Sequence, residues 1–181
     1  YLTVTFDVHA PTFRHEMFAD YKGTRKPMAE ELRQQVPVIK DVLHAMHIEV
    51  IEKAGLEADD LLGTLSHRCE EKGMDVSIIS GDRDTLQLAT EHIKIRIPKT
   101  KQGKTEVEDY YAADVQERYG VTPKEFIDVK ALMGDTADNI PGVPGVGEKT
   151  STKIIQQYQT IENAYEHVDE LKPPRASKNL K

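Results

Sequence analysis

Carboxylates are the main candidate catalytic groups in this chain, because they occur in short groups that are far apart in the sequence. One pair, Asp135 and Asp138, stands just before a glycine-rich turn. The other groups are Asp7; Glu57, Asp59 and Asp60; and Asp82 and Asp84. The single cysteine and the absence of paired histidine spacing exclude a zinc-cysteine cluster, whereas carboxylate oxygens suit hard ions such as Mg²⁺ or Mn²⁺. Eight clustered carboxylates repel one another unless cations are bound, which favours more than one divalent ion.

Two divalent ions about 4 Å apart can generate a hydroxide and stabilise both the attacking and the leaving oxygen of a phosphoryl transfer. A solvated acidic surface without ligands is one alternative, which requires all four groups to be exposed by chance. For the group at residues 57–60 a second alternative is compensation of a helix dipole. Three acids within four residues exceed what that compensation needs.

The turn that follows Asp138 could bind an anion. Three glycines shape it, and a predicted helix at residues 148–158 begins directly after it, so that backbone amides and a helix N-terminus would face a phosphate. Glu148 separates the last glycine from Lys149, so this is not a P-loop. The pattern is that of a helix-hairpin-helix, which holds duplex phosphates without reading bases. The candidate residues are Gly142, Gly145, Gly147, Lys149 and Lys153.

Composition is compatible with a nucleic-acid partner despite the net charge of −7 in 181 residues. When the eight grouped acids are set aside from the 31 Asp and Glu, 23 remain against 24 Lys and Arg. With cations on those eight, the remaining surface is nearly neutral and can carry basic patches. No apolar run approaches the roughly 20 residues that a membrane-crossing helix needs, so we expect a protein with no membrane association.

Residues 9–26 lack regular periodicity, and basic residues alternate with aromatic ones. The members are Phe13, Arg14, His15, Phe18, Tyr21, Lys22, Arg25 and Lys26. Cations contact backbone phosphates and aromatic rings stack on unpaired bases, so this composition suits single-stranded nucleic acid. A solvated loop with a few packing aromatics has the same composition, which leaves both interpretations open.

Strands and helices alternate in the first part of the chain. We expect strands at residues 2–6, 48–51, 74–80 and 93–97, helices between them, and therefore a mainly parallel sheet. The acidic groups follow the first three strands, so the carboxyl ends of these strands would bring them to one edge. The apolar stripe Leu32, Val36, Ile39, Leu43 and Met46 is predicted to be core, with Pro37 kinking or delaying its helix.

The second part of the chain is predicted to be helical. After a polar loop at residues 99–104 we expect helices at residues 112–119, 123–133 and 148–158. The basic end that begins at Lys172 is predicted to be a linker or another truncation.

Five motifs in order resemble a known family. They are Phe6-Asp-Val-His-Ala-Pro-Thr-Phe-Arg-His-Glu, Tyr21-Lys-Gly-Thr-Arg, Glu57-Ala-Asp-Asp, Gly81-Asp-Arg-Asp and Gly134-Asp-Thr-Ala-Asp-Asn-Ile-Pro-Gly-Val. The chain resembles the 5′-nuclease domain of bacterial DNA polymerase I, which is related to flap endonucleases and phage 5′-exonucleases. The resemblance implies a PIN-like α/β fold, with a mainly parallel sheet flanked by helices. We expect a core at residues 1–110 with a helical arch at 9–35, and a helical subdomain at 111–181 with the helix-hairpin-helix at 134–158.

The resemblance also implies roles for single residues. Asp7, Glu57 and Asp59 correspond to ligands of a first metal, with Asp60 close by. Asp82, Asp84 and Asp135 correspond to ligands of a second metal, which Asp138 supports.

In the arch, Arg14 and Lys22 correspond to catalytic residues whose positive side chains contact the scissile phosphate, and Arg25 belongs to the same basic run. Tyr21 corresponds to a residue on which the terminal base stacks. The hairpin of related proteins also binds K⁺ between protein carbonyls and phosphate.

The implied activity is removal of 5′ ends and flaps from DNA, and of RNA primers on DNA, by a two-metal mechanism in replication and repair. We expect a monomeric bacterial protein of the cytoplasm, associated with the nucleoid, with a polymerase domain in the same chain. One departure is that the family begins with an apolar strand and a metal-binding Asp well before the position of Asp7. This leaves a second hypothesis, a non-catalytic fragment that binds DNA by its structure.

Overall fold

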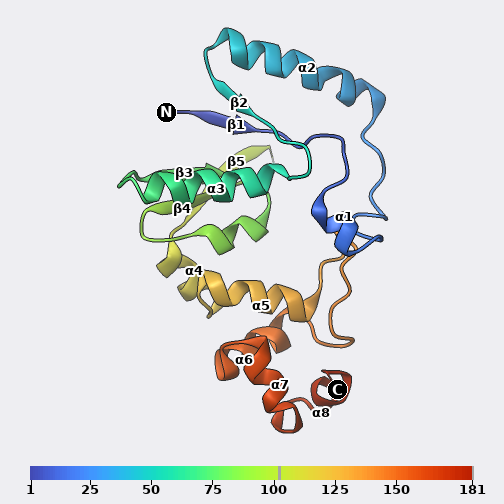
Figure 1. Ribbon diagram of the computed structural model, residues 1–181. Coiled ribbons are helices and arrows are strands. Elements are labelled where there is room, and N and C mark those ends of the chain that lie inside the picture. The colour runs from blue at the N-terminus through green and yellow to red at the C-terminus, as the bar shows by residue number, and fades with distance from the viewer. Residues whose placement is uncertain (102, 181) are drawn as a thin grey trace. The chain divides into compact units, whose positions relative to one another are not determined.

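The computed structural model describes residues 1–101 and 103–180, and they form two compact units. Unit 1 comprises Tyr1–Leu65 and Ala137–Asn139, and unit 2 comprises Ser66–Thr136 and Ile140–Lys181. The predicted boundary after residue 110 differs from this division and stays a prediction. Figure 1 traces the chain through both units. None of the described helices is long and apolar enough to span a membrane.

Unit 1 is built on a short parallel pair of strands, β1 (Thr3–Thr5) and β2 (Glu49–Ile51), with Val4 opposite Val50. Between them the chain forms the short helix α1 (Phe13–Met17) and the long helix α2 (Glu30–Ala45). After β2, the helix α3 (Ala58–Glu70) begins in unit 1 and ends in unit 2. The two strands and their parallel pairing agree with the sequence-based expectation.

The prediction that the α2 stripe is core was wrong for the described chain. No residue of α2 is buried, and Leu32, Ile39 and Met46 are 52%, 50% and 62% exposed. The helix itself forms as the spacing predicts, and it runs through Pro37 without a delayed start. Periodicity reports that one face of a helix is apolar, but it does not report whether another element covers that face.

Unit 2 holds a second, mixed sheet. The strands β3 (Val76–Ile79) and β4 (Ile93–Lys101) are parallel, and β5 (Lys104–Tyr110) pairs antiparallel with β4. The strand β5 was missed, because its polar residues lack the alternation of a half-buried strand, and it pairs through its backbone. The order of strands and helices predicts one sheet, whereas the strands of the described residues form two.

The rest of unit 2 is helical (Figure 1). The elements are the 3-10 helix η1 (Arg83–Leu88), α4 (Ala112–Tyr119), α5 (Pro123–Met133), α6 (Glu148–Tyr158), α7 (Ile161–Glu166), the 3-10 helix η2 (Val168–Glu170) and α8 (Pro174–Leu180). The predicted bounds of α4, α5 and α6 are confirmed. α4 ends at Gly120 in the left-handed conformation, and the Thr122 and Glu125 side chains form a capping box at the start of α5.

The chain end is not the predicted linker. Residues 174–180 form α8, on which Ala176 and Leu180 are buried. The two apolar residues lie four positions apart on a basic, polar segment, which is too weak a pattern for a prediction. The core of unit 2 includes Leu86, Ile93, Ile95, Ile154 and Ile155, all fully buried.

Candidate active site and hairpin

In unit 1, Asp7 and the acidic group at the start of α3 are brought together beyond the ends of β1 and β2. Asp7 Oδ1 accepts a hydrogen bond from the backbone N–H of Ala58 at 2.7 Å. Asp60 Oδ2 accepts one from the backbone N–H of Glu57 at 2.8 Å. Two carboxylates thus bind the first backbone amides of α3, where the helix dipole favours negative charge. Asp59 lies on the same turn and is exposed.

Arg14 of α1 pairs with Asp60, although 46 positions separate them in the sequence. Its two terminal nitrogens donate to the two carboxylate oxygens at 2.9 and 2.8 Å, a bidentate geometry. The hydrogen bond from Arg14 holds the pKa of Asp60 below its ordinary value, against the opposing effect of burial. The same hydrogen bond raises the pKa of Arg14. The pair is therefore fully charged near neutral pH.

Replacing Arg14 with glutamine should make the stability of the protein less sensitive to acid. A lowered pKa of Asp60 in the folded state contributes stability that is present above the ordinary value of 3.8 and is lost as the pH falls through the folded pKa. The difference in unfolding free energy between wild type and Arg14→Gln should thus be constant at pH 5–7 and shrink below pH 4. Urea unfolding across this range measures it. Arg33→Gln, on an exposed pair with Glu30, is the control.

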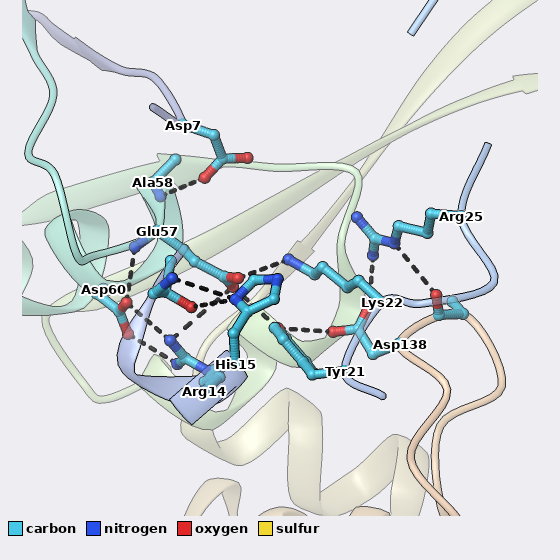
Figure 2. Close-up of polar contacts among 12 residues, drawn as sticks. Asp7, Arg14, His15, Tyr21, Lys22, Arg25, Glu57, Ala58, Asp60 and Asp138 are labelled. Carbon is cyan, nitrogen blue, oxygen red and sulfur yellow. Dashed lines mark hydrogen bonds and ion pairs between the residues drawn. The ribbon is translucent and has the colours of Figure 1, made fainter. Parts of the chain in front are cut away.

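Lys22 and Tyr21 converge on Glu57 (Figure 2). Lys22 Nζ lies 2.8 Å from Glu57 Oε1, and the Tyr21 hydroxyl lies 3.1 Å from both Glu57 Oε2 and Asp138 Oδ2. Tyr21 is only 5% exposed, and burial together with the two carboxylates raises its pKa. The base-stacking role of Tyr21 stays a prediction, and it requires the ring to leave this buried position.

Asp138 lies in this group, and residues 137–139 belong to unit 1. Arg25 forms an ion pair with Asp138, and Arg25 Nε donates to the carbonyl of Ala137 at 3.1 Å. The Asn139 side chain donates to the Asp20 carbonyl at 2.8 Å. The carboxylate of Asp138 contacts Arg25 and Tyr21 of the basic segment, and its supporting role at the second metal site stays a prediction.

A pocket of about 370 Å³ opens beside these residues in unit 1. Its lining includes the segment from Asp7 to Thr12, together with His15, Lys22, Arg25 and Glu57. The positive side chains of Lys22 and Arg25 thus line the same pocket as the carboxylates of Asp7 and Glu57. Such a lining suits a ligand that carries a phosphate and is held beside acidic groups.

In unit 2 a second acidic group surrounds Lys130 of α5. Lys130 Nζ lies 3.0 Å from Asp84 Oδ1 and 2.7 Å from Asp135 Oδ2. Asp82 caps η1, where its Oδ1 accepts a hydrogen bond from the backbone N–H of Asp84 at 2.8 Å. Burial raises the pKa of Asp84, an effect that Lys130 opposes and that Asp82 and Asp135 reinforce.

Sequence reasoning missed Lys130. It lies in the last turn of α5, five positions before Asp135. This short distance in sequence to a predicted metal ligand could have indicated its role. Burial opposes the charge of Lys130, yet hydrogen bonds to the two carboxylates raise its pKa. The ammonium is therefore a built-in positive charge between two aspartates.

The carboxylate oxygens have the right chemistry for hard divalent cations, and Lys130 already holds one positive charge between Asp84 and Asp135. In the chain as described, however, no three His, Cys, Asp or Glu side chains converge closely enough to hold a metal ion. Several predicted ligands, including Glu57, Asp60 and Asp138, are instead paired with arginine, lysine or tyrosine. The predicted ligand sets stay predictions.

The turn between α5 and α6, called the hairpin below (residues 142–147), depends on a close approach of two backbones. A Cβ on Gly142 would lie 2.2 Å from the carbonyl carbon of Met133 and 2.4 Å from the nitrogen of Gly134. The Asp135–Ile140 bridge and a hydrogen bond from Val143 N–H to the Leu132 carbonyl, at 2.8 Å, fix the same approach. Gly147 is the N-cap of α6, and Lys149 and Lys153 are exposed.

Replacing Gly142 with alanine should destabilise unit 2 by about 2–3 kcal/mol, because backbone atoms must move to admit the new methyl group. Gly81→Ala is the matched control, since nothing lies within 4 Å of its added Cβ. It should leave the unfolding free energy unchanged or raise it by up to about 1 kcal/mol. Urea unfolding measures both. Equal stability of the two variants would contradict the close approach.

An α/β region with grouped carboxylates, followed by a helical region with a phosphate-binding type of hairpin, defines a class of proteins that act on nucleic-acid backbones. Comparison with known families specifies the class. Residues 1–120 match the family "5′-3′ exonuclease, N-terminal resolvase-like domain", and residues 121–181 match "5′-3′ exonuclease, C-terminal SAM fold". The chain belongs to the 5′-3′ exonuclease family.

Individual relatives agree with this assignment. The chain is 45% identical over 181 residues to DNA polymerase I of Bacillus caldotenax and 44% identical over 180 residues to that of Bacillus subtilis. It is covered almost completely in both alignments and spans 20% of each relative's length.

Solved structures of bacteriophage T5 proteins share the fold. The T5 D15 protein co-crystallised with metal ions superposes with a TM-score of 0.81 at 26% identity, over 98% of this chain and 69% of the other. The T5 D15 flap endonuclease in complex with DNA and metal ions gives a TM-score of 0.80 at 26% identity, over 98% and 67%. The Rad2 catalytic core, with a TM-score of 0.61 at 21% identity over 92% and 49%, shares the fold alone.

Proposed function

We propose that this chain hydrolyses phosphodiester bonds at 5′ ends and 5′ flaps of DNA, and of RNA primers paired with DNA, with Mg²⁺ or Mn²⁺ as cofactor. The observation that carries the proposal is the pocket of unit 1, where Lys22 and Arg25 face Asp7 and Glu57. Family membership and the T5 protein bound to DNA and metal ions support it. We also propose that the chain acts as part of a monomeric bacterial DNA polymerase I, with a polymerase domain in the same chain. This protein would work in the cytoplasm, at the nucleoid.

Two groups of carboxylates would hold the cations. Asp7, Glu57 and Asp59 of unit 1 are the proposed ligands of one ion, and Asp82, Asp84 and Asp135 of unit 2 those of another. Bound there, the ions would supply an activated water and stabilise charge on the reacting oxygens.

The basic residues would bind the substrate. Arg14 and Lys22 donate to Asp60 and Glu57 in the structure, and both side chains can present the same donors to phosphate oxygens in place of these carboxylates. Arg25 is the third such cation. Duplex DNA would lie on the hairpin, whose amides and lysines suit backbone phosphates and whose carbonyl oxygens could hold a K⁺ ion.

Incubation with a 5′-flap duplex tests the proposal. Cleavage should require Mg²⁺ or Mn²⁺, stop on addition of EDTA and be lost in Asp82→Ala. Cleavage that persists with EDTA would contradict the proposed chemistry.

The second candidate is a non-catalytic module that binds DNA by its structure. The absence of three convergent ligand side chains in the described chain favours it, as does the partial neutralisation of Asp84 and Asp135 by Lys130. Calorimetric titration with Mn²⁺ separates the two candidates. A nuclease should bind the ion tightly and lose binding in Asp84→Asn, whereas a pure binding module should show no tight site.

A further inference from the structure

Arg175 of α8 lies directly against the hairpin. A Cβ added to Gly145, the glycine with φ of +79°, would lie 2.5 Å from Arg175 Nε and 2.7 Å from Cζ. The guanidinium therefore occupies the space that any other residue at position 145 would fill. The absence of a side chain at Gly145 allows a cation from another helix to reach the hairpin backbone.

The position of Arg175 is held by the fold. Asn179, one turn further along α8, donates a hydrogen bond to the carbonyl of Pro144 in the hairpin. On the same helix Ala176 and Leu180 are buried, which anchors α8 within unit 2. A side chain that is carried by an anchored helix loses less conformational freedom when it binds a ligand than one on a mobile tail.

The charge of Arg175 is not used inside the protein. Arg175 is exposed, and it forms no salt bridge with any residue that the structure describes. An exposed arginine with no internal ion pair favours an anion with several oxygens, because its planar fork donates two parallel hydrogen bonds.

We propose that Arg175 is a further phosphate-binding residue, which extends the hairpin of residues 142–147 into a contact with the backbone of duplex nucleic acid. The proposal rests on the proposed function, which assigns duplex binding to the hairpin. It adds α8, predicted from sequence to be a linker, to the binding surface. The contact is independent of base sequence, as is usual for backbone contacts.

Duplex binding without metal tests the role of Arg175. Affinity for a nicked DNA duplex is measured in EDTA at several NaCl concentrations, so that neither cleavage nor the binding of divalent ions contributes. Arg175→Gln should weaken binding on the order of fivefold at low salt and reduce the slope of log K against log salt by about 0.9, the value for one phosphate contact. Arg175→Lys should retain most of the slope, which separates lost charge from a folding defect.

Lys72→Gln is the matched control, because it removes one exposed positive charge in the turn between α3 and β3. Its salt slope should equal that of the wild type. If wild type and Arg175→Gln bind with the same slope and affinity, the role of Arg175 is refuted while duplex binding stands. If the wild type does not bind duplex at all, the proposed function fails and this inference fails with it.

Discussion

Replacement of Asp135 by asparagine should lower the rate of flap cleavage by roughly a thousandfold, equivalent to about 4 kcal/mol of transition-state stabilisation. Asn keeps the shape of Asp, and the bridge between residues 135 and 140 is made by backbone atoms, so the local fold should persist. What is lost is one negative charge next to Lys130, whose ammonium then retains only Asp84. The charges of Lys130 and Asp84 then cancel, so this group would attract a divalent cation much less strongly.

The measurement is a single-turnover rate on a 5′-flap duplex, together with the affinity for Mn²⁺ by calorimetry. Asp41→Asn, an exposed aspartate on α2, is the control and should keep both values. Thermal unfolding of Asp135→Asn should remain close to that of the wild type. A variant that folds normally and still cleaves at the wild-type rate would remove Asp135 from the proposed ligands.

The second large effect concerns the stability of the helical part of unit 2. Ile155→Ala should reduce the free energy of unfolding by about 3–4 kcal/mol, because Ile155 on α6 is 0% exposed and its truncation leaves a cavity. α5 and α6 pack on each other, so the loss should also loosen the hairpin between them. Urea unfolding gives the free energy, and hydrogen exchange of the α6 amides locates the change.

Ile127→Ala on α5 is the matched control, since Ile127 is 46% exposed. Truncating it removes the same atoms from a helix in the same unit, and it should cost less than about 1 kcal/mol. If the two variants were equally stable, Ile155 would not be in the core of unit 2.

Local patterns predicted much of the secondary structure, because local interactions decide it. The capping residues Thr122 and Glu125, the helix-ending Gly120 and the glycines of the hairpin act within a few positions of the chain. Three helices therefore have the bounds that the sequence predicts. The strand β5 was not predicted, because backbone hydrogen bonds to β4 hold it in place. The periodicity of its side chains gives no sign of that pairing.

Whether another element covers the apolar face of a helix was the feature least predictable from the sequence. The α2 stripe is apolar at regular helical spacing, yet none of its residues is buried. α8 carries only two apolar residues within a basic segment, and both are buried. Burial depends on which elements meet in space, and neither pattern contains that information.

For the site, the amino-acid sequence by itself determined the residue types: the four carboxylate groups, the basic and aromatic segment, and the glycines of the hairpin, along with the family. The tertiary structure decided the partners. It placed Arg14 on Asp60, put Asp138 with Arg25 and Tyr21, inserted Lys130 between Asp84 and Asp135, and set Arg175 against Gly145. Most of these contacts join residues that are tens of positions apart in the sequence. Ion pairs and hydrogen bonds act over only a few ångströms, so the partners of a charged side chain depend on which groups the fold brings close to it.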